Sequence, residues 1–247
     1  MTRPMNGRPR ARARRAALVA ALAAPAVLVA PALAVAVPVI AADAICVRPT
    51  QDAAGQLVSP PLTITGSGFG PGARVELRRG SRTFFGTAGA DGVLSAQLSV
   101  LDLLTARSAP GSTPFTVVAN DLGGISGTPP AQGVSNEVRL RAAPLAFAAS
   151  PTRAKPSARV TFRLSGFAPD RIVYAHYRYN GKVRANVPFG RASNPCGLLT
   201  TTRRQIPASN PQTGVWRVQF DHNRAFSPKV SPRIAASINV YRTLVRR

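Results

Sequence analysis

The stretch Gly66-Ser67-Gly68-Phe69-Gly70-Pro71-Gly72 combines four glycines with one phenylalanine and one proline. A related stretch, Ser165-Gly166-Phe167-Ala168-Pro169-Asp170, follows it with the two phenylalanines 98 positions apart. Glycine permits positive φ and proline fixes φ, so both stretches favour a tight turn, and the phenylalanine supplies an apolar side chain that can cover a core. Alternating apolar and polar residues precede and follow each turn, at 62–65 and 73–77, then at 160–164 and 171–174. A strand, a turn and a second strand, repeated at this spacing, predict two tandem β domains.

Short strand candidates separated by turn residues fill both halves of the chain. Val160, Phe162 and Leu164 share one face of a run with polar residues opposite, a period typical of half-buried antiparallel strands. Asn180-Gly181 between two β-rich runs predicts a two-residue hairpin, because a type I′ turn needs positive φ at both positions. The candidates are residues 62–66, 73–79, 82–87, 92–100, 113–119, 134–141, 158–165, 171–179, 182–188, 198–206, 213–221 and 233–242. This strand density predicts an all-β fold of two tandem immunoglobulin-like β-sandwich domains.

The segment from Leu62 to Leu98 resembles the start of secreted bacterial immunoglobulin-like domains, which are common in exported proteins of high-GC Gram-positive bacteria. The shared features are a strand, G-x-G-F-x-P-G, V-x-L, and an Ala90-Asp91-Gly92 turn before another strand. A more distant similarity is to the neocarzinostatin apoproteins, which share the strand–Gly–apolar–Gly opening. This chain lacks that family's two intradomain cysteine pairs, so the family's ligand cleft is not carried over. The resemblance implies a fold type and not an activity.

Residues 1–44 have the pattern of a secretory signal peptide. Residues 1–15 contain six arginines and no acid, and residues 16–42 are a continuous run of Ala, Val, Leu, Ile and Pro. Two A-x-A sites are available, Ala34-Val35-Ala36 and Ala42-Asp43-Ala44, and the second is favoured because it leaves the whole apolar run behind. The alternative is a retained membrane anchor, since the run is long enough to span a bilayer, although its prolines disfavour a spanning helix.

The remaining chain is expected to divide into a first domain at 45–142 and a second at 143–247, which differ in charge. The first contains eight basic and six acidic residues, whereas the second contains eighteen basic and two acidic residues, a net charge of +16. A net charge this high attracts polyanions. Outside a cell these are anionic cell-wall polymers, acidic polysaccharides, phospholipid surfaces and DNA. The alternative is a generally basic, solvated surface with no dedicated ligand.

Basic residues gather around the predicted hairpin and in one later strand of the second domain. The residues predicted to contact the anionic partner are Arg178, Lys182, Arg184, Arg203 and Arg204. Tyr177 and Tyr179 interleave with the hairpin and suit stacking on sugars or bases. Specific nucleic-acid binding is not expected, and the oligomeric state is left open.

The chain contains two cysteines, Cys46 and Cys196. In an exported protein, two cysteines most simply form one disulfide. This bond would join the lead-in of the first domain to the Asn194-Pro195-Cys196-Gly197 turn of the second. It would close a loop of 150 residues, for which the chain-entropy model gives about 4–5 kcal/mol of stabilisation. The alternatives are cysteines too far apart to bond, or pairing with other molecules.

Sequence patterns of catalytic and metal sites are missing. His176 and His222 are 46 positions apart, and neither has a second His or Cys at metal-ligand spacing. Asp221 adjoins His222, but adjacency in sequence does not orient a base toward a nucleophile. Gly66-Ser67-Gly68 has the wrong spacing for a nucleophile elbow. We therefore predict no catalytic residue, no cofactor and no obligate metal.

These observations predict an exported, non-catalytic binding or structural protein of the cell envelope or extracellular space. Its basic second domain would contact an anionic cell-wall polymer, polysaccharide or phospholipid surface. Two other hypotheses stay open. One is a small-ligand carrier or an enzyme with an interdomain cleft that gathers His176, His222 and an acid, and the other is a purely structural spacer.

Overall fold

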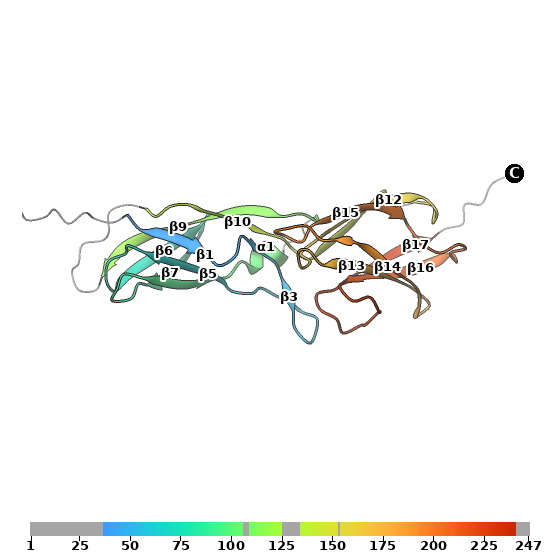
Figure 1. The fold of residues 1–247 in the computed structure, drawn as a ribbon, viewed down its shortest axis with the longest axis horizontal. Coiled ribbons are helices and arrows are strands. Elements are labelled where there is room, and N and C mark those ends of the chain that lie inside the picture. Colours follow the sequence, from blue (N-terminus) through green and yellow to red (C-terminus); the bar gives the residue numbers. More distant parts are fainter. Residues whose placement is uncertain (1–36, 106–108, 125–133, 153, 241–247) are drawn as a thin grey trace, which may run out of the picture. The chain divides into compact units, whose positions relative to one another are not determined.

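The computed structural model describes residues 37–105, 109–124, 134–152 and 154–240 (Figure 1). Nearly all of its regular elements are β-strands, which confirms the predicted all-β fold. Two separate hydrophobic cores form, one from residues between Ile40 and Ala142 and one from residues between Val160 and Val240. Within the described ranges, no helix is long and apolar enough to cross a membrane.

The first core is enclosed by a three-stranded and a five-stranded sheet, which we call the first sandwich. The smaller sheet has the order β1 (Val39–Ala42), β5 (Leu62–Ser67), β8 (Leu94–Leu98). The larger has the order β2 (Cys46–Val47), β10 (Val138–Ala142), β9 (Thr113–Gly124), β6 (Ala73–Arg79), β7 (Arg82–Thr87). A short hairpin, β3 (Thr50–Gln51) and β4 (Leu57–Val58), and the helix α1 (Leu101–Thr105) lie outside the two sheets.

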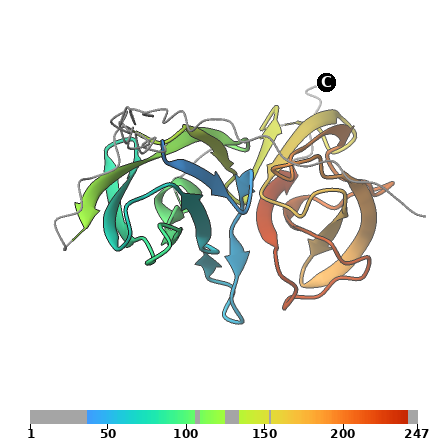
Figure 2. The ribbon, with the colours of Figure 1, turned by 60° about the vertical axis from the view of Figure 1, so that its left-hand side comes forward.

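The second core is enclosed by a three-stranded and a four-stranded sheet, the second sandwich, whose strands curve around a common interior in Figure 2. One sheet has the order β11 (Ala146–Ser150), β12 (Arg159–Ser165), β15 (Leu199–Arg204). The other has the order β14 (Lys182–Arg191), β13 (Ile172–Tyr179), β16 (Gly214–Asp221), β17 (Ile234–Val240). Leaving out the two-residue strands β2, β3 and β4, each sandwich has seven main strands in chain order. The first, second and fifth form one sheet, and the fourth, third, sixth and seventh form the other. This shared connectivity is immunoglobulin-like and follows from the sequence repeat.

The predicted periodicity and hairpin are present in the second sandwich. Val160, Phe162 and Leu164 of β12 are all buried, while Arg159 and Arg163 are exposed. Asn180 and Gly181 have φ of 48° and 75°, and Tyr179 pairs directly with Lys182. These angles are those of the two-residue turn that the Asn-Gly pair predicts.

The two Gly-Phe-x-Pro turns are built alike. Phe69 is 5% exposed in the first core and Phe167 is 0% exposed in the second. The amide of each phenylalanine donates at 3.4 Å to a glycine carbonyl, that of Gly92 or that of Gly197. The next amide in each turn donates to a side chain near the C-terminal end of β9 or directly after β16. Gly70 donates to Asp121 Oδ2 at 2.7 Å, and Ala168 donates to His222 Nε2 at 3.0 Å.

Gly92 and Gly197 pack so closely against the backbone of Phe69 and Phe167 that these positions leave no room for a side chain. A Cβ added to Gly92 would lie 2.4 Å from the carbonyl oxygen of Phe69, and one added to Gly197 would lie 1.7 Å from that of Phe167. Gly72 also has positive φ, 67°, but a Cβ there would meet nothing within 4 Å.

We predict that Gly92→Ala destabilises the first sandwich more than Gly72→Ala. Both substitutions place alanine in the left-handed region, which costs about 1–2 kcal/mol, but only the first also displaces the Phe69 turn. Urea unfolding monitored by circular dichroism measures the difference. Equal unfolding midpoints for the two variants would contradict the proposed packing of Gly92 on Phe69.

The strand β1 lies inside the segment that the sequence assigned to the signal peptide. Val39 to Ala42 pair with β5, Ile40 is 2% exposed, and its amide and carbonyl both bond to the Asn136 side chain. Cleavage after Ala44 would remove this core strand, so the predicted end of the signal peptide at residue 44 conflicts with the fold. The other A-x-A site, Ala34-Val35-Ala36, leaves β1 intact. Residues 1–36, which contain that site, lie outside the described residues.

Candidate anion-binding cleft

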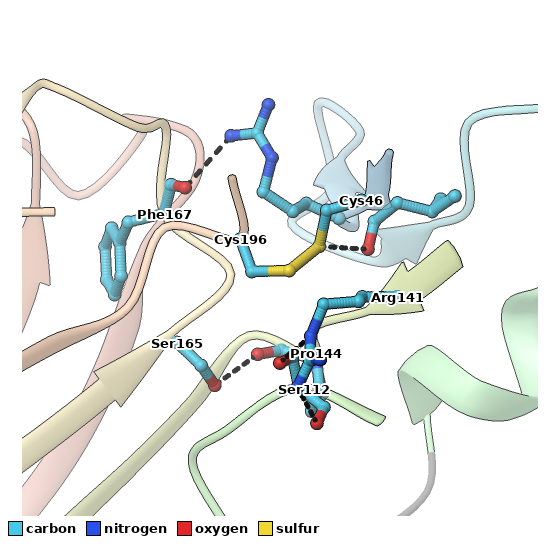
Figure 3. The surroundings of a disulfide bond; sticks show 9 residues. Cys46, Ser112, Arg141, Pro144, Ser165, Phe167 and Cys196 are labelled. Carbon is cyan, nitrogen blue, oxygen red and sulfur yellow. Dashed lines mark hydrogen bonds between the residues drawn. A yellow bond between two sulfur atoms is a disulfide. The ribbon is translucent and has the colours of Figure 1, made fainter. Parts of the chain in front are cut away.

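Cys46 and Cys196 form the predicted disulfide (Figure 3). Cys46 opens β2 and Cys196 lies in the turn before β15, with their Cα atoms 5.4 Å apart. Both cysteines are buried and pack against Ala143, which follows β10. A covalent bond therefore joins an element of the first sandwich to a turn of the second.

Hydrogen bonds surround this disulfide. Arg48 Nη1 donates to the carbonyl oxygen of Phe167 at 2.9 Å, and Ser165 Oγ donates to the carbonyl oxygen of Pro144 at 2.6 Å (Figure 3). A neighbouring cleft of about 490 Å³ is lined by residues of both sandwiches, including Arg48 and Ala168. Neither His176 nor His222 lines this cleft. It therefore does not gather the groups that the carrier or enzyme hypothesis requires.

His222 holds the Phe167 turn in place. Its Nε2 accepts from the Ala168 amide, so its Nδ1 carries the proton and donates to the Ile172 carbonyl at 2.9 Å. Burial lowers the pKa of His222, with a smaller contribution from Arg171, while the bond to Ile172 and the charge of Asp221 oppose this shift. The folded protein therefore favours the neutral ring.

We predict that acidification destabilises the protein through His222. The folded pKa is below the ordinary value of about 6.5, so the unfolded chain binds a proton first, and stability falls as pH drops below that value. His222→Gln keeps an acceptor for Ala168 and a donor for Ile172 but does not titrate. Chemical unfolding between pH 7.5 and pH 5.5 should show a larger loss for the wild type than for this variant. An identical pH dependence in the wild type and the variant would show that protonation of His222 does not affect the free energy of unfolding.

His176 takes part in a separate buried network. Its Nδ1 lies 2.8 Å from Asn186 Oδ1 and its Nε2 lies 3.2 Å from Asp221 Oδ1. Gln219 Nε2 donates to the other oxygen of Asp221 at 2.7 Å. His176 and Asp221 are both 0% exposed, so the pair has no access to a substrate in this structure. The described residues also contain no group of three or more His, Cys, Asp or Glu arranged to hold a metal ion.

The two sandwiches use their acidic residues differently. In the first, Asp102 bonds Arg79 at 2.8 Å and Arg82 at 3.2 Å, and Glu137 bonds Arg139 at 3.3 Å. Burial raises the pKa of Asp102, but the hydrogen bond and charge of Arg79 and the charge of Arg82 outweigh this and hold it below its usual value.

In the second sandwich the two acids are used within the fold. Asp221 bonds His176, and the Asp170 side chain accepts from Asn194. Across the described part of this sandwich, no arginine or lysine forms a salt bridge with an acidic residue. The described positive charges of this sandwich are therefore not neutralised by direct ion pairs.

Three of these arginines line one cleft of about 450 Å³, which we call the arginine cleft. It is bounded by residues of β12, β13, β14 and β15 and by Pro207, where β14 and β15 are edge strands of their sheets. Its polar lining is Arg159, Arg203, Arg204, Thr201, Thr202 and Tyr177. Its apolar lining is Val187, Phe189 and Pro207. The cleft thus combines positive charge, hydroxyl groups and an apolar wall.

Strand pairing brings like charges together at this cleft. Arg159 lies directly opposite Arg204 across β12 and β15. Like charges directly opposite each other destabilise a sheet, and no described acid offsets them here. The Arg159 guanidinium donates to the Thr202 carbonyl at 3.2 Å, and the Arg203 guanidinium carbon lies 5.6 Å from the centre of the Phe189 ring.

Tyr177 lies at this cleft with a protonated hydroxyl. Its side chain is buried in the second core and 1% exposed. Burial raises the pKa of Tyr177, and the nearby charge of Arg203 opposes the shift without overcoming it. Among the described residues, the Tyr177 hydroxyl has no hydrogen-bond partner within the protein. A neutral phenol can donate a hydrogen bond to a ligand in the cleft.

The structure does not bring the five predicted basic residues into one cleft. Arg203 and Arg204 line the arginine cleft, whereas Arg178 lines another with Arg217, its direct partner across β13 and β16. Lys182 and Arg184 are exposed and line neither of these clefts.

The two predicted aromatic contacts are largely used inside the fold. Burial of Tyr177 removes its ring from any stacking role, which corrects the sequence-based hypothesis, and only its hydroxyl remains relevant. The Tyr179 ring lies 5.1 Å from that of Trp216, and its hydroxyl donates to the Thr213 carbonyl.

Arg159 and the hydroxyls of Thr201 and Thr202 were missed at the sequence level. Arg159 is 44 positions from Arg203, and only the pairing of β12 with β15 makes the two residues neighbours. If the predicted strands 158–165 and 198–206 had been paired with each other, Arg159 would have been placed beside Arg204.

A scan against protein-family models found no match, and a search of curated proteins also found none. Among solved structures, the chain is similar to the crystal structure of a tetra-tandem repeat in the extending region of a large adhesion protein. The match has 16% identity and a TM-score of 0.26, and it covers 82% of this chain and 49% of that chain. The chain thus spans about half the length of this structure. The resemblance to secreted bacterial immunoglobulin-like domains and to neocarzinostatin apoproteins stays a prediction.

Proposed function

We propose that the protein is an exported, non-catalytic binding protein whose second sandwich contacts an anionic polymer or surface outside the cell. The observation that carries this proposal is the lack of any salt bridge to an arginine or lysine in the described part of the second sandwich. Unneutralised charge raises the energy of the folded state, and an anionic partner removes that cost. The first sandwich, whose net charge is small, serves as a spacer or attachment element.

Export is supported by two features of the chain. The basic and apolar N-terminal segment fits a secretory signal, and the buried disulfide suits an oxidising compartment. The location of β1 favours processing after Ala36.

We expect the secreted protein to begin at Val37. Intact-mass spectrometry of protein recovered from the culture medium or envelope of an expressing high-GC Gram-positive host measures this directly. A mass that corresponds to a start at Ile45 would show that β1 is dispensable, and retention of Met1 would contradict cleavage.

We also predict that anionic retention depends on charges of the second sandwich. Lys182→Gln/Arg184→Gln should elute from a heparin column at a lower salt concentration than the wild type, because exposed charges govern such binding. The matched control, Arg74→Gln/Arg78→Gln, removes two exposed charges from the first sandwich and should elute close to the wild type. The proposal fails if the control shifts as far as the test variant, or if the wild type does not bind at physiological salt. The second of these results would favour a structural spacer.

A further inference from the structure

We propose that the arginine cleft binds one sugar unit that carries an anionic group, such as a carboxylate, phosphate or sulfate on a polysaccharide. This inference rests on the proposed function and narrows it to one site and one ligand class. It follows from the charge, the hydroxyl groups, the apolar wall and the volume of the cleft.

Positive charge provides the first requirement. Arg159 of β12 and Arg203 and Arg204 of β15 line the cleft, and none forms a salt bridge in the described part of the chain. Planar guanidinium groups bind carboxylate, phosphate and sulfate oxygens through paired hydrogen bonds. An anion beside Arg159 and Arg204 would also relieve the repulsion between these directly opposed residues.

Hydroxyl groups and an apolar wall provide the second requirement. Thr201, Thr202 and the protonated Tyr177 offer hydroxyls that suit the hydroxyls of a sugar. Half-buried Val187 and exposed Pro207 offer apolar surface for the C–H face of a sugar ring. The volume of about 450 Å³ lies within the range of small-molecule sites and exceeds what a bare inorganic anion needs.

Two other anionic partners fit the cleft less well. Of the large apolar side chains that are exposed in the described residues, none lines the cleft, so it has no anchor to insert into a phospholipid surface. The aromatic rings at the cleft, those of Tyr177 and Phe189, are 1% and 0% exposed, so neither offers a face on which a nucleic-acid base can stack.

Isothermal titration calorimetry of the purified protein at physiological salt tests the inference. The probes are tetragalacturonate for carboxylate, a heparin tetrasaccharide for sulfate and glucose 1-phosphate for phosphate. Maltotetraose is the neutral-sugar control, and inorganic phosphate is the sugar-free control. A single-stranded oligonucleotide and phosphatidylglycerol vesicles represent the competing classes of partner.

We expect saturable binding with one site for at least one anionic sugar, and none for maltotetraose. Arg203→Gln/Arg204→Gln should weaken this binding by about tenfold or more, as expected for lost charge-assisted hydrogen bonds. Tyr177→Phe should weaken it by a smaller factor without changing the unfolding midpoint, because it removes only the hydroxyl. Arg224→Gln/Lys229→Gln loses the same charge from two exposed positions of the same sandwich that do not line the cleft, and it should bind the tetrasaccharide within about twofold of the wild type.

Equal losses of affinity in the two double variants would show that the arginine cleft is not the binding site, but would leave the proposed function intact. Tighter binding of the oligonucleotide or the vesicles than of every anionic sugar would also overturn the inference, as would binding of inorganic phosphate with equal affinity. If no anionic probe binds the wild type, both the inference and the proposed function fail.

Discussion

Burial of Phe167 in the second core anchors the turn that lies where the two sandwiches are joined. Full burial of a phenylalanine side chain contributes about 1.5–3 kcal/mol, but here the backbone of the same residue also has fixed partners. Its amide bonds Gly197, its carbonyl accepts from Arg48 of the first sandwich, and Ala168 beside it bonds His222. Cys196, next to Gly197, forms the disulfide to Cys46. A single turn therefore couples the core of one sandwich to contacts with the other.

The acidic residues differ between the two sandwiches in the groups that they contact. In the first sandwich two of them, Asp102 and Glu137, form salt bridges with arginines. In the second, Asp221 is used to complete a buried network with His176 and Gln219. In the described part of the second sandwich no arginine or lysine forms a salt bridge with an acidic residue, which is the basis for the anionic partner that we propose. Because strand pairing places Arg159 opposite Arg204, part of this charge is concentrated at one cleft.

Much of the fold was predictable because its determinants are local. The alternation of Val160, Phe162 and Leu164 and the Asn180-Gly181 turn each specify a strand or a hairpin within a few residues. The strand β11 lacks such a pattern, since Ala146–Ser150 is mostly alanine, and β2, β3 and β4 contain two residues each, too few to show a period. The strand β1 was hidden because Val39–Ala42 continues the apolar run of the predicted signal peptide. Only pairing with β5 identifies it as part of a core.

The site was less predictable than the fold because it depends on long-range pairing. Net charge indicated the second sandwich as the candidate anion-binding domain. Arg203 and Arg204 were predicted as contacts because they are adjacent in sequence. Their neighbour Arg159 comes from another strand, and the burial of Tyr177 follows from the inward face of β13, which it shares with Val173 and Ala175. Period-two alternation along β13 would have predicted that Tyr177 is buried, because it shares a strand face with Val173 and Ala175.

We propose that Arg159, Arg203 and Arg204 act together as one anion site. Its most direct measurement is an NMR titration of arginine side-chain Nε–Hε signals with tetragalacturonate, the carboxylate-bearing probe. We expect the signals of these three residues to shift along one saturating curve, while those of Arg74 and Arg78 in the first sandwich stay in place. Small, unsaturated shifts spread over all exposed arginines would contradict it.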